Sequence, residues 1–488
     1  SHRHAITRSP YTAAPAMAAI RPALLFALLL GPRASVALLA RTPRDAGVAR
    51  GNAVTSAYQW PSGRGHVGHY SASRNAAPIN LTASLSWTWH DPRGRYWNSP
   101  VGVVLDDQQN IFLSSLDGVR KFTKEGSLLW SHYREEGEEL PDTAALYDGA
   151  VYYGTTAGRV VALSMETGKS LWSAQLPRTD GTNGWVSAFD GLVLVSADVR
   201  QELDGKDLAE WRSDGVAVAL NASDGRVVWR FQPRAPLWNF LALSAGDGTL
   251  VFQDFEGRVY RLRSSDGQQL WASGGLKGSW TDGSALLGEN GVVYAVNTRK
   301  LGPGAAHSPG DVSAYRLDDG QLLWTTEVPR VPNNAPALGR LAGSDRLALV
   351  QPVGQQVGQG FPTDVYALDA ETGEVLWVFN GPVQKDTLQA GDANPEARAQ
   401  RKAAGVREIT LPNPWGAPSI DARGTVYIGS EEGPVYSLRD EDNSGMVEGE
   451  NEVSVLDTGA CFSGSSSPAI GDGMLAVASI DALYVFRD

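Results

Sequence analysis

The sequence is poor in cysteine, in basic residues and in long apolar runs, and each shortage excludes a class of protein. The single cysteine, Cys461, cannot form an intrachain disulfide, which excludes a disulfide scaffold and a cysteine-based zinc site. The 42 Lys and Arg residues are outnumbered by 54 Asp and Glu residues, and the net charge of -12 argues against nucleic acid as a partner. After the N-terminal region, no segment has the ~18 uninterrupted apolar residues that a transmembrane helix needs, so no transmembrane span is expected in the mature chain.

The beginning of the chain is typical of a targeting sequence. Met17 precedes the apolar run 22–30, which is too short to span a bilayer, and small residues allow cleavage after Ala37. We therefore predict that residues 17–37 are a secretory signal peptide. Residues 1–16 are then expected to be an upstream or disordered tail.

Residues 38–59 carry three arginines but only one acidic residue. Two interpretations stay open for them: a linker, or a transit segment of the kind that follows a signal peptide in bipartite plastid targeting. The predicted destination is accordingly the secretory pathway or the extracellular space, with the plastid as the alternative.

Glycine and tryptophan are abundant, and they recur together as a glycine followed four residues later by a tryptophan. The six pairs are Gly126 and Trp130, Gly168 and Trp172, Gly225 and Trp229, Gly267 and Trp271, Gly320 and Trp324, and Gly373 and Trp377. Successive tryptophans are 42 to 57 residues apart. Repeats of this length are typical of propellers and solenoids.

Within each repeat, short alternating apolar and polar stretches are separated by glycine-containing turns. Residues 417–421, 425–429 and 435–438 are one example of three successive strands. With the strand that ends each repeat, the pattern predicts four short strands per repeat, which is the composition of a propeller blade. We therefore predict an all-β fold, an eight-bladed β-propeller over residues 60–488.

The two ends of this region predict how the ring closes. The eighth repeat, residues 467–486, has only three strands, whereas an extra strand at residues 85–89 precedes the first repeat. Pairing the extra strand with the eighth repeat completes that blade and leaves no open edge in the ring.

The stretch 367–377 reads AxDxxTGExxW, and residues 162–172, 219–229 and 314–324 share its alanine, glycine and tryptophan. This motif resembles the tryptophan-docking motif of the pyrroloquinoline-quinone (PQQ) repeat propellers, and the resemblance covers residues 60–488. It implies that each tryptophan wedges between two neighbouring blades. The implied docking residues are Trp87, Trp130, Trp172, Trp229, Trp271, Trp324 and Trp377.

The resemblance implies two kinds of function. The family includes quinoprotein alcohol dehydrogenases, which bind PQQ and calcium, and non-catalytic propellers such as the bacterial outer-membrane assembly lipoprotein and sensor ectodomains. The dehydrogenases typically stack PQQ between a tryptophan and a disulfide of neighbouring cysteines. The lone Cys461 departs from that pattern, and no CxxCH haem motif is present.

A second set of aromatic and amide residues stands at or just before the first strand of a blade, which is the strand nearest the central channel. Aromatic faces beside amide groups suit a flat or sugar-like ligand, although the same residues can also fill and stiffen the channel. Asp282 is the candidate base if the chain is a dehydrogenase. The candidate channel-rim residues are Trp97, Asn98, Trp185, Trp238, Asn239, Trp280, Asn334 and Trp415.

Two further features allow a functional and a plain interpretation. Asp440, Asp442 and Ser444 resemble the front half of a calcium loop, and the alternative is an acidic hairpin turn. Residues 384–407 form an insertion with a predicted short helix and a basic cluster, which is either a docking site or a solvated helix.

The leading hypothesis is a non-catalytic propeller without cofactor that binds a protein partner or a small ligand at the channel mouth in an exported or organellar compartment, and that is a monomer. The alternative is a PQQ- and calcium-dependent dehydrogenase that oxidises alcohols or sugars. A sensor ectodomain is a third possibility, but no membrane span follows the propeller.

Overall fold

The computed structural model describes most of the chain beyond residue 56. The described residues are 57–66, 68, 71–94, 100–176, 184–197, 215–281, 283–299, 308–332, 334–354, 362–383, 396, 399, 400, 403, 414–431, 433–460, 462 and 467–488. They belong to one compact unit, Arg50–Asp488. The predicted tail and signal peptide, and nearly all of residues 38–59, lie outside them.

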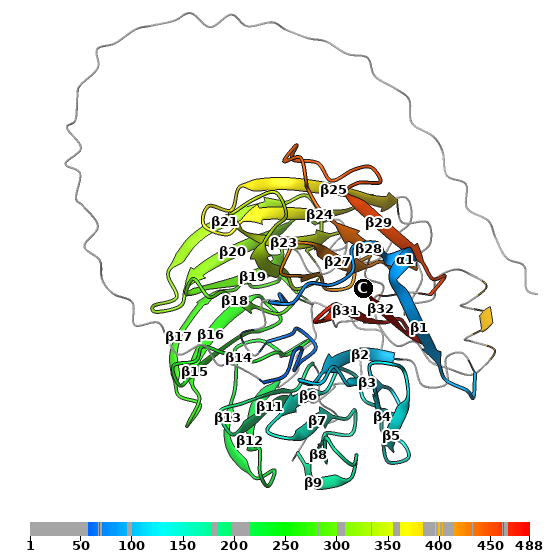
Figure 1. The fold of residues 1–488 in the computed structure, drawn as a ribbon. Coiled ribbons are helices and arrows are strands. Elements are labelled where there is room, and N and C mark those ends of the chain that lie inside the picture. Colours follow the sequence, from blue (N-terminus) through cyan, green and yellow to red (C-terminus); the bar gives the residue numbers. More distant parts are fainter. Residues whose placement is uncertain are drawn as a thin grey trace, which may run out of the picture. The chain divides into compact units, whose positions relative to one another are not determined.

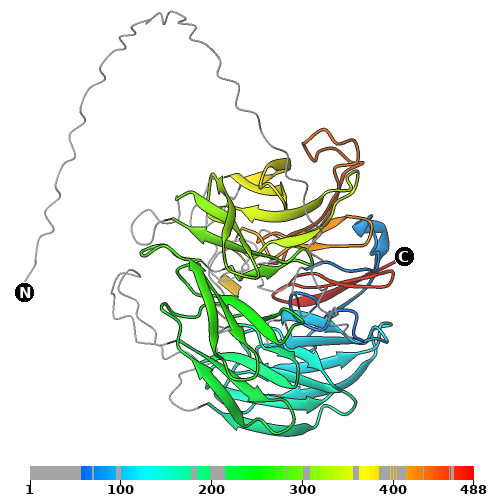
Figure 2. The ribbon, with the colours of Figure 1, turned by 90° about the vertical axis from the view of Figure 1, so that its left-hand side faces the viewer.

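Eight four-stranded antiparallel sheets follow one another around a ring, which confirms the predicted eight-bladed propeller (Figures 1 and 2). Blades 1 to 4 are formed by β2 (Pro100–Leu105), β3 (Ile111–Ser115), β4 (Gly118–Phe122), β5 (Leu128–Tyr133); β6 (Ala145–Tyr147), β7 (Ala150–Gly154), β8 (Arg159–Ser164), β9 (Ser170–Gln175); β10 (Ser187–Phe189), β11 (Leu192–Ala197), β12 (Val216–Asn221), β13 (Val227–Phe231); and β14 (Leu243–Ser244), β15 (Thr249–Gln253), β16 (Arg258–Arg263), β17 (Gln269–Gly274).

Blades 5 to 7 are formed by β18 (Leu286–Leu287), β19 (Val292–Thr298), β20 (Gly310–Arg316), β21 (Leu322–Val328); β22 (Ala337–Arg340), β23 (Leu347–Val353), β24 (Pro362–Asp369), β25 (Val375–Val383); and β26 (Ser419–Ile420), β27 (Val426–Gly429), β28 (Pro434–Leu438), β29 (Val453–Asp457). In each of these blades the strands lie in chain order. Each connection within a blade therefore joins two neighbouring antiparallel strands, as in a hairpin.

Blade 8 draws its strands from both ends of the propeller, as the sequence predicted. It contains β30 (Ala469–Gly471), β31 (Met474–Ala478) and β32 (Ala482–Arg487). Its fourth strand is β1 (Leu85–His90), which pairs antiparallel with β32. The prediction that the N-terminal strand closes the ring is confirmed.

A short helix, α1 (Leu81–Ser84), leads into β1. It begins at Asn80, whose side-chain oxygen accepts a hydrogen bond from the backbone N–H of Ala83 at 3.0 Å. Among the described residues no helix is long and apolar enough to span a bilayer.

The core lies between the faces of neighbouring blades. Strands such as β3, β7 and β15 are buried along their whole length, whereas the outer strand β9 has no fully buried residue and is half-buried at two of its six positions. One hydrophobic cluster joins Leu194 of blade 3 to Phe252 of blade 4. Because each blade has two apolar faces, it needs a neighbour on each side.

The outer-strand tryptophans lie at these blade-to-blade seams. Trp229 of blade 3 donates its indole N–H to the Ser264 carbonyl oxygen of blade 4 at 2.7 Å. Gly267 closes that hairpin with a φ of +69°, and a Cβ built on it stands 2.7 Å from the Trp229 ring, so only glycine fits. Equivalent pairs are Trp87 and Gly126, Trp130 and Gly168, Trp172 and Gly225, Trp271 and Gly320, and Trp324 and Gly373.

The seam between blades 6 and 7 is different. In blade 7 the connection between β28 and β29 is the longer segment 439–452 rather than a glycine hairpin. The indole nitrogen of Trp377 is buried at this seam and has no hydrogen-bond partner in the described structure.

The docking role of these tryptophans can be measured at Trp229. Trp229→Ala removes a 7% exposed ring from the blade 3 and blade 4 core, so we expect a loss of about 3–5 kcal/mol in the free energy of unfolding. The neighbouring Val228→Ala, at a 46% exposed position, is the control and is expected to cost less than about 1 kcal/mol. Urea unfolding followed by far-UV circular dichroism measures the free energy of unfolding of both variants. Equal losses would show that the seam contact of Trp229 does not stabilise the fold more than an exposed side chain does.

Candidate functional site

The first described residues of the chain cross the middle of the ring (Figure 1). We call residues 60–66 together with 71–73 the channel segment. Trp60 exchanges two backbone hydrogen bonds with Leu105 of blade 1, and the Pro61 carbonyl accepts one from Leu146 of blade 2. The channel segment is therefore fixed by main-chain contacts and not only by side-chain packing.

The same segment also contacts the two blades on the other side of the ring closure. The Gly63 carbonyl accepts the N–H of Ser467 at 2.9 Å in blade 8, and the Ser71 carbonyl accepts the N–H of Ile420 at 2.8 Å in blade 7. Inner strands, or the residues just before them, supply these partners. The channel segment thus occupies the centre of the propeller.

Arg64 is the central residue of this segment and is only 1% exposed. Its Nε donates to Ser71 Oγ at 3.0 Å, and its Nη2 donates to the carbonyls of Ala335 at 3.0 Å and Pro336 at 2.7 Å in blade 6. The guanidinium carbon lies 6.0 Å from the centre of the Trp185 ring. Burial lowers the pKa of Arg64 to about 9. Among the described residues, the guanidinium contacts carbonyl oxygens and an aromatic face and forms no ion pair with a carboxylate.

The candidate rim tryptophans are covered by the protein itself. Trp185 and Trp415 are each 1% exposed and Trp280 is 5% exposed, and they belong to three separate hydrophobic clusters. Trp415 packs against Tyr436 with a ring-centre distance of 5.6 Å, and its carbonyl accepts the side-chain N–H of Asn334 at 3.1 Å. The structure therefore does not bring these rings together around one open rim, and it favours the interpretation that they fill the channel.

The remaining rim candidates are partly described. Trp238 is half-buried against Phe255, and Asn239 next to it is also half-buried with a φ of +47°. Trp97, Asn98 and the candidate base Asp282 lie outside the described residues, so their roles stay predictions.

The exposure of the channel tryptophans tests whether PQQ fits this chain, because the flat cofactor needs an open aromatic face on which to stack. The face of Trp185 is covered by the channel segment: a Cβ built on Gly63 stands 2.9 Å from its ring. The buried tryptophans Trp185, Trp280 and Trp415 therefore present no open face to a stacked quinone.

The acidic loop 439–452 contains the metal-site candidates. Carboxylate oxygens of Asp440, Asp442 and Glu452 all lie within 4.8 Å of one another. Ser444, the third metal-site candidate, forms hydrogen bonds within the loop. Its backbone N–H donates to Asp440, and its hydroxyl donates to the Met446 carbonyl at 2.9 Å. The sequence pattern missed Glu452, which stands one position beyond the place where a calcium loop has its last ligand.

Hydrogen bonds inside the acidic loop already use some of these oxygens. Glu452 accepts the backbone N–H of Glu441 at 2.7 Å and that of Glu448 at 3.1 Å. Burial raises the pKa of Asp440, and the charges of Glu452 and Asp442 raise it further. Three close carboxylates suit a hard cation such as calcium, and the calcium assignment stays a prediction.

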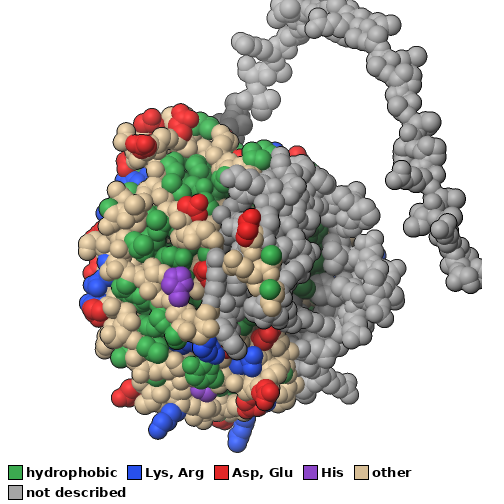
Figure 3. Space-filling view, turned by 90° about the vertical axis from the view of Figure 1, so that its right-hand side faces the viewer, with side chains coloured by type: hydrophobic (Ala, Val, Ile, Leu, Met, Phe, Trp, Pro, Cys, Tyr) green, Lys and Arg blue, Asp and Glu red, His purple; other side chains and the backbone are tan. Residues whose placement is uncertain are grey.

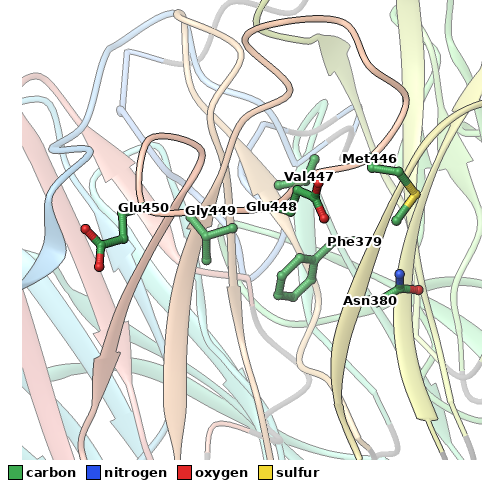
Figure 4. A pocket seen from close by; sticks show the side chains of 8 residues that line it. Phe379, Asn380, Met446, Val447, Glu448, Gly449 and Glu450 are labelled. Carbon is green, nitrogen blue, oxygen red and sulfur yellow. The ribbon is translucent and has the colours of Figure 1, made fainter.

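A pocket of about 430 Å³ lies at the seam of blades 6 and 7, between β25 and the acidic loop (Figure 4). Its lining residues are Phe379, Asn380, Met446, Val447, Glu448, Gly449, Glu450 and Val453. In the sequence, the one signal for this pocket is that blade 7 lacks the glycine and tryptophan pair of the other repeats. Figure 3 shows one side of the molecule, with acidic side chains gathered at the upper edge.

The insertion 384–407 follows β25 directly. Four of its residues are described, Glu396, Ala399, Gln400 and Ala403, and all four are helical and exposed. Its basic residues lie outside the described part, so the docking interpretation stays a prediction.

Comparison with known proteins places the chain among repeat propellers. A family model described as outer membrane protein assembly factor BamB matches residues 95–199 and 193–358, which together cover more than half of the chain. The chain belongs to this family. The predicted resemblance to PQQ-like repeat propellers is confirmed.

Individual relatives include BamB and quinone-dependent dehydrogenases. Outer membrane protein assembly factor BamB of Yersinia pestis is 25% identical over 319 residues, which is 61% of this chain and 76% of that protein. The dehydrogenase subunit of the quinone alcohol dehydrogenase of Acetobacter aceti is 25% identical over 213 residues, but that is 41% of this chain and only 28% of the enzyme. The match to BamB therefore extends over more of both proteins.

Solved structures confirm the fold only. BamB of Moraxella catarrhalis has a TM-score of 0.56 at 16% identity and covers 83% of this chain and 97% of its own. A europium-containing methanol dehydrogenase has a TM-score of 0.61 at 12% identity, covering 89% and 99%. At these identities the two structures show a shared propeller and do not separate a BamB-like function from dehydrogenase activity.

The acidic loop leads to a pH prediction. Because the pKa of Asp440 is raised in the folded protein, ionisation of this carboxyl disfavours folding at pH values above the folded pKa, and this penalty disappears below the unfolded pKa of about 3.9. Without metal, Asp440→Asn is therefore expected to be more stable than the wild type at pH 7, and this difference is expected to vanish below pH ~3.5. Thermal unfolding in EDTA measures both.

Asp107→Asn, at an exposed position in blade 1, is the matched control and is expected to change stability by less than about 0.5 kcal/mol. If calcium binds the acidic loop, added calcium raises the melting temperature of the wild type and not of Asp440→Asn. A metal-free Asp440→Asn variant that is less stable than the wild type at pH 7 would contradict the sign of the predicted pH effect.

Proposed function

We propose that this chain is a non-catalytic BamB-like propeller that binds a protein partner in an exported compartment. Family membership supports this proposal, as does the match to Yersinia BamB, which covers 76% of that protein. The printed name of that relative describes a factor in the assembly of outer membrane proteins, a role that involves other proteins. None of the named relatives supports the plastid alternative.

The observation that carries the proposal is the filled channel. In a propeller, a central cofactor needs space and exposed groups near the axis. Here that volume contains Arg64, which is 1% exposed, and the channel segment makes main-chain contacts with blades 1, 2, 7 and 8. A protein partner, in contrast, needs only the outer surfaces of the ring, which the channel segment leaves uncovered.

The cofactor chemistry also supports a binding role. PQQ would supply a two-electron acceptor for alcohol or sugar oxidation, with calcium to polarise it. The chain has no neighbouring cysteines for the disulfide half of the stacking site, and the channel tryptophans Trp185, Trp280 and Trp415 are buried. We therefore derive no catalytic step for this chain, and we propose that it uses neither PQQ nor a catalytic calcium ion.

Reconstitution with PQQ and calcium tests this function. The purified protein is incubated with both, separated from free cofactor by gel filtration, and examined by absorbance and by dye reduction with alcohols and aldose sugars. We expect no stoichiometric quinone absorbance and no dye reduction, because the channel segment covers Trp185 and because Trp280 and Trp415 are buried. A quinoprotein dehydrogenase apoenzyme treated in parallel is the positive control.

Stoichiometric quinone binding with substrate-dependent dye reduction would overturn the proposal and establish the dehydrogenase alternative. In that event Asp282→Asn is the first variant to assay for loss of turnover, because Asp282 is the candidate base named from the sequence.

A further inference from the structure

At the seam of blades 6 and 7, a segment of the acidic loop adds to the sheet of blade 6 and then leaves it. The N–H of Val378 donates to the Gly445 carbonyl at 3.1 Å, and the N–H of Val447 donates to the Val378 carbonyl at 3.1 Å. Met446 thereby forms a parallel bridge with Val378 on the outer edge of β25. After Val447 the chain turns away, and no further bridge to β25 follows among the described residues.

Beyond Val378, the main-chain groups on the outer edge of β25 are therefore available for hydrogen bonds to another strand. In an antiparallel strand the N–H and C=O of alternate residues point to the same edge. Since both main-chain groups of Val378 point outward to the acidic loop, those of Asn380 point outward as well, and Asn380 is exposed. Two residues beyond, Pro382 has no N–H to offer. The open edge thus provides one donor and acceptor pair, at Asn380.

The pocket at this opening combines an apolar floor with an acidic wall. Phe379 and Val447 are 7% and 2% exposed and form part of the floor. Glu448 and Glu450 are exposed on the loop, and no Lys or Arg side chain of the described residues forms an ion pair with either. In Figure 4 the Glu448 carboxylate lies beside the Phe379 ring, and Glu450 lies at the far end of the loop.

The surrounding chain is acidic as well, which adds to the negative charge at the pocket. Residues 439–452 contain one basic and six acidic residues, and the whole chain has a net charge of -12. The volume of about 430 Å³ lies within the range of ~300–1,000 Å³ that is typical of ligand pockets. A strong negative potential over an apolar floor favours a cation that carries aliphatic carbon, which is the composition of a lysine or arginine side chain.

We propose that this pocket binds an extended, basic segment of the partner protein. One residue of the segment pairs its main chain with Asn380, continuing the strand that residues 445–447 begin. A lysine or arginine side chain of the segment reaches Glu448 and Glu450, and an apolar neighbour packs on Phe379. This inference rests on the proposed function and specifies the chemistry of the partner.

The binding test uses fluorescence anisotropy with a fluorescein-labelled peptide of alternating lysine and valine residues and the full-length protein. We expect micromolar binding that weakens as salt is added, because exposed charges are screened. The double variant Glu448→Gln and Glu450→Gln removes both charges without changing shape, and we expect it to weaken binding by about 10-fold or more. Glu166→Gln, an exposed acidic position in blade 2, is the matched control and is expected to bind like the wild type.

Two further measurements test the strand pairing. Asn380→Lys places a cation in the pocket and is expected to weaken binding more than the neutral double variant does. The same peptide with methylated backbone nitrogens cannot donate to Asn380 and is expected to bind more weakly than the parent peptide. Circular dichroism and the melting temperature confirm that each variant is folded before its affinity is compared.

Several results would overturn this proposal: no binding by the wild type, equal binding by the double glutamine variant, or equal binding of a peptide with glutamate in place of lysine. Self-association in sedimentation that Asn380→Lys abolishes would identify a second copy of this chain as the occupant and would overturn it as well. None of these results bears on PQQ binding, so failure here is distinguishable from failure of the proposed function.

Discussion

The pairing of β1 with β32 is the constraint on which the rest of this propeller depends. Every blade is a sheet with two apolar faces, and both faces are buried only when the ring has no gap. One hydrophobic cluster around this closure joins Trp60 and Ile111, from the first part of the propeller, to Met474 and Phe486 near its other end. The six seam contacts between outer-strand tryptophans and glycines form together only because this closure holds the blades in register.

The chain that leads to β1 also determines where binding can occur. Before it reaches α1, it crosses the centre of the ring, where Arg64 contacts blade 6 and Gly63 contacts blade 8. A propeller normally offers its axis as a binding site, but here the axis contains protein. We expect recognition on the outer surfaces instead, for example at the seam where a longer loop replaces the repeat hairpin in blade 7.

Much of the fold could be predicted from the sequence because each blade repeats a local pattern. The spacing between Gly267 and Trp271 recurs in the other repeats and indicated the positions of the blades. The missing strand of the eighth repeat indicated how the ring closes. The position of Arg64 could not be predicted, since its partners lie some 270 residues away and no local pattern records them. The rim tryptophans were named for their place before inner strands, but the sequence does not indicate that the channel segment covers Trp185. The pocket lies where blade 7 lacks the repeat hairpin. The sequence shows that the hairpin pattern is absent, but not which structure the replacing segment 439–452 adopts.

The closure has a consequence in time. A ribosome makes β1 before any other strand of the propeller, yet its partner β32 is made last, nearly 400 residues later. Until then β1 carries an unpaired edge and the apolar side of Trp87, and such strands are prone to pair with the wrong neighbour. The ring is complete only once β32 has been made, so the yield of folded protein depends on how well β1 is kept from pairing with other chains before then.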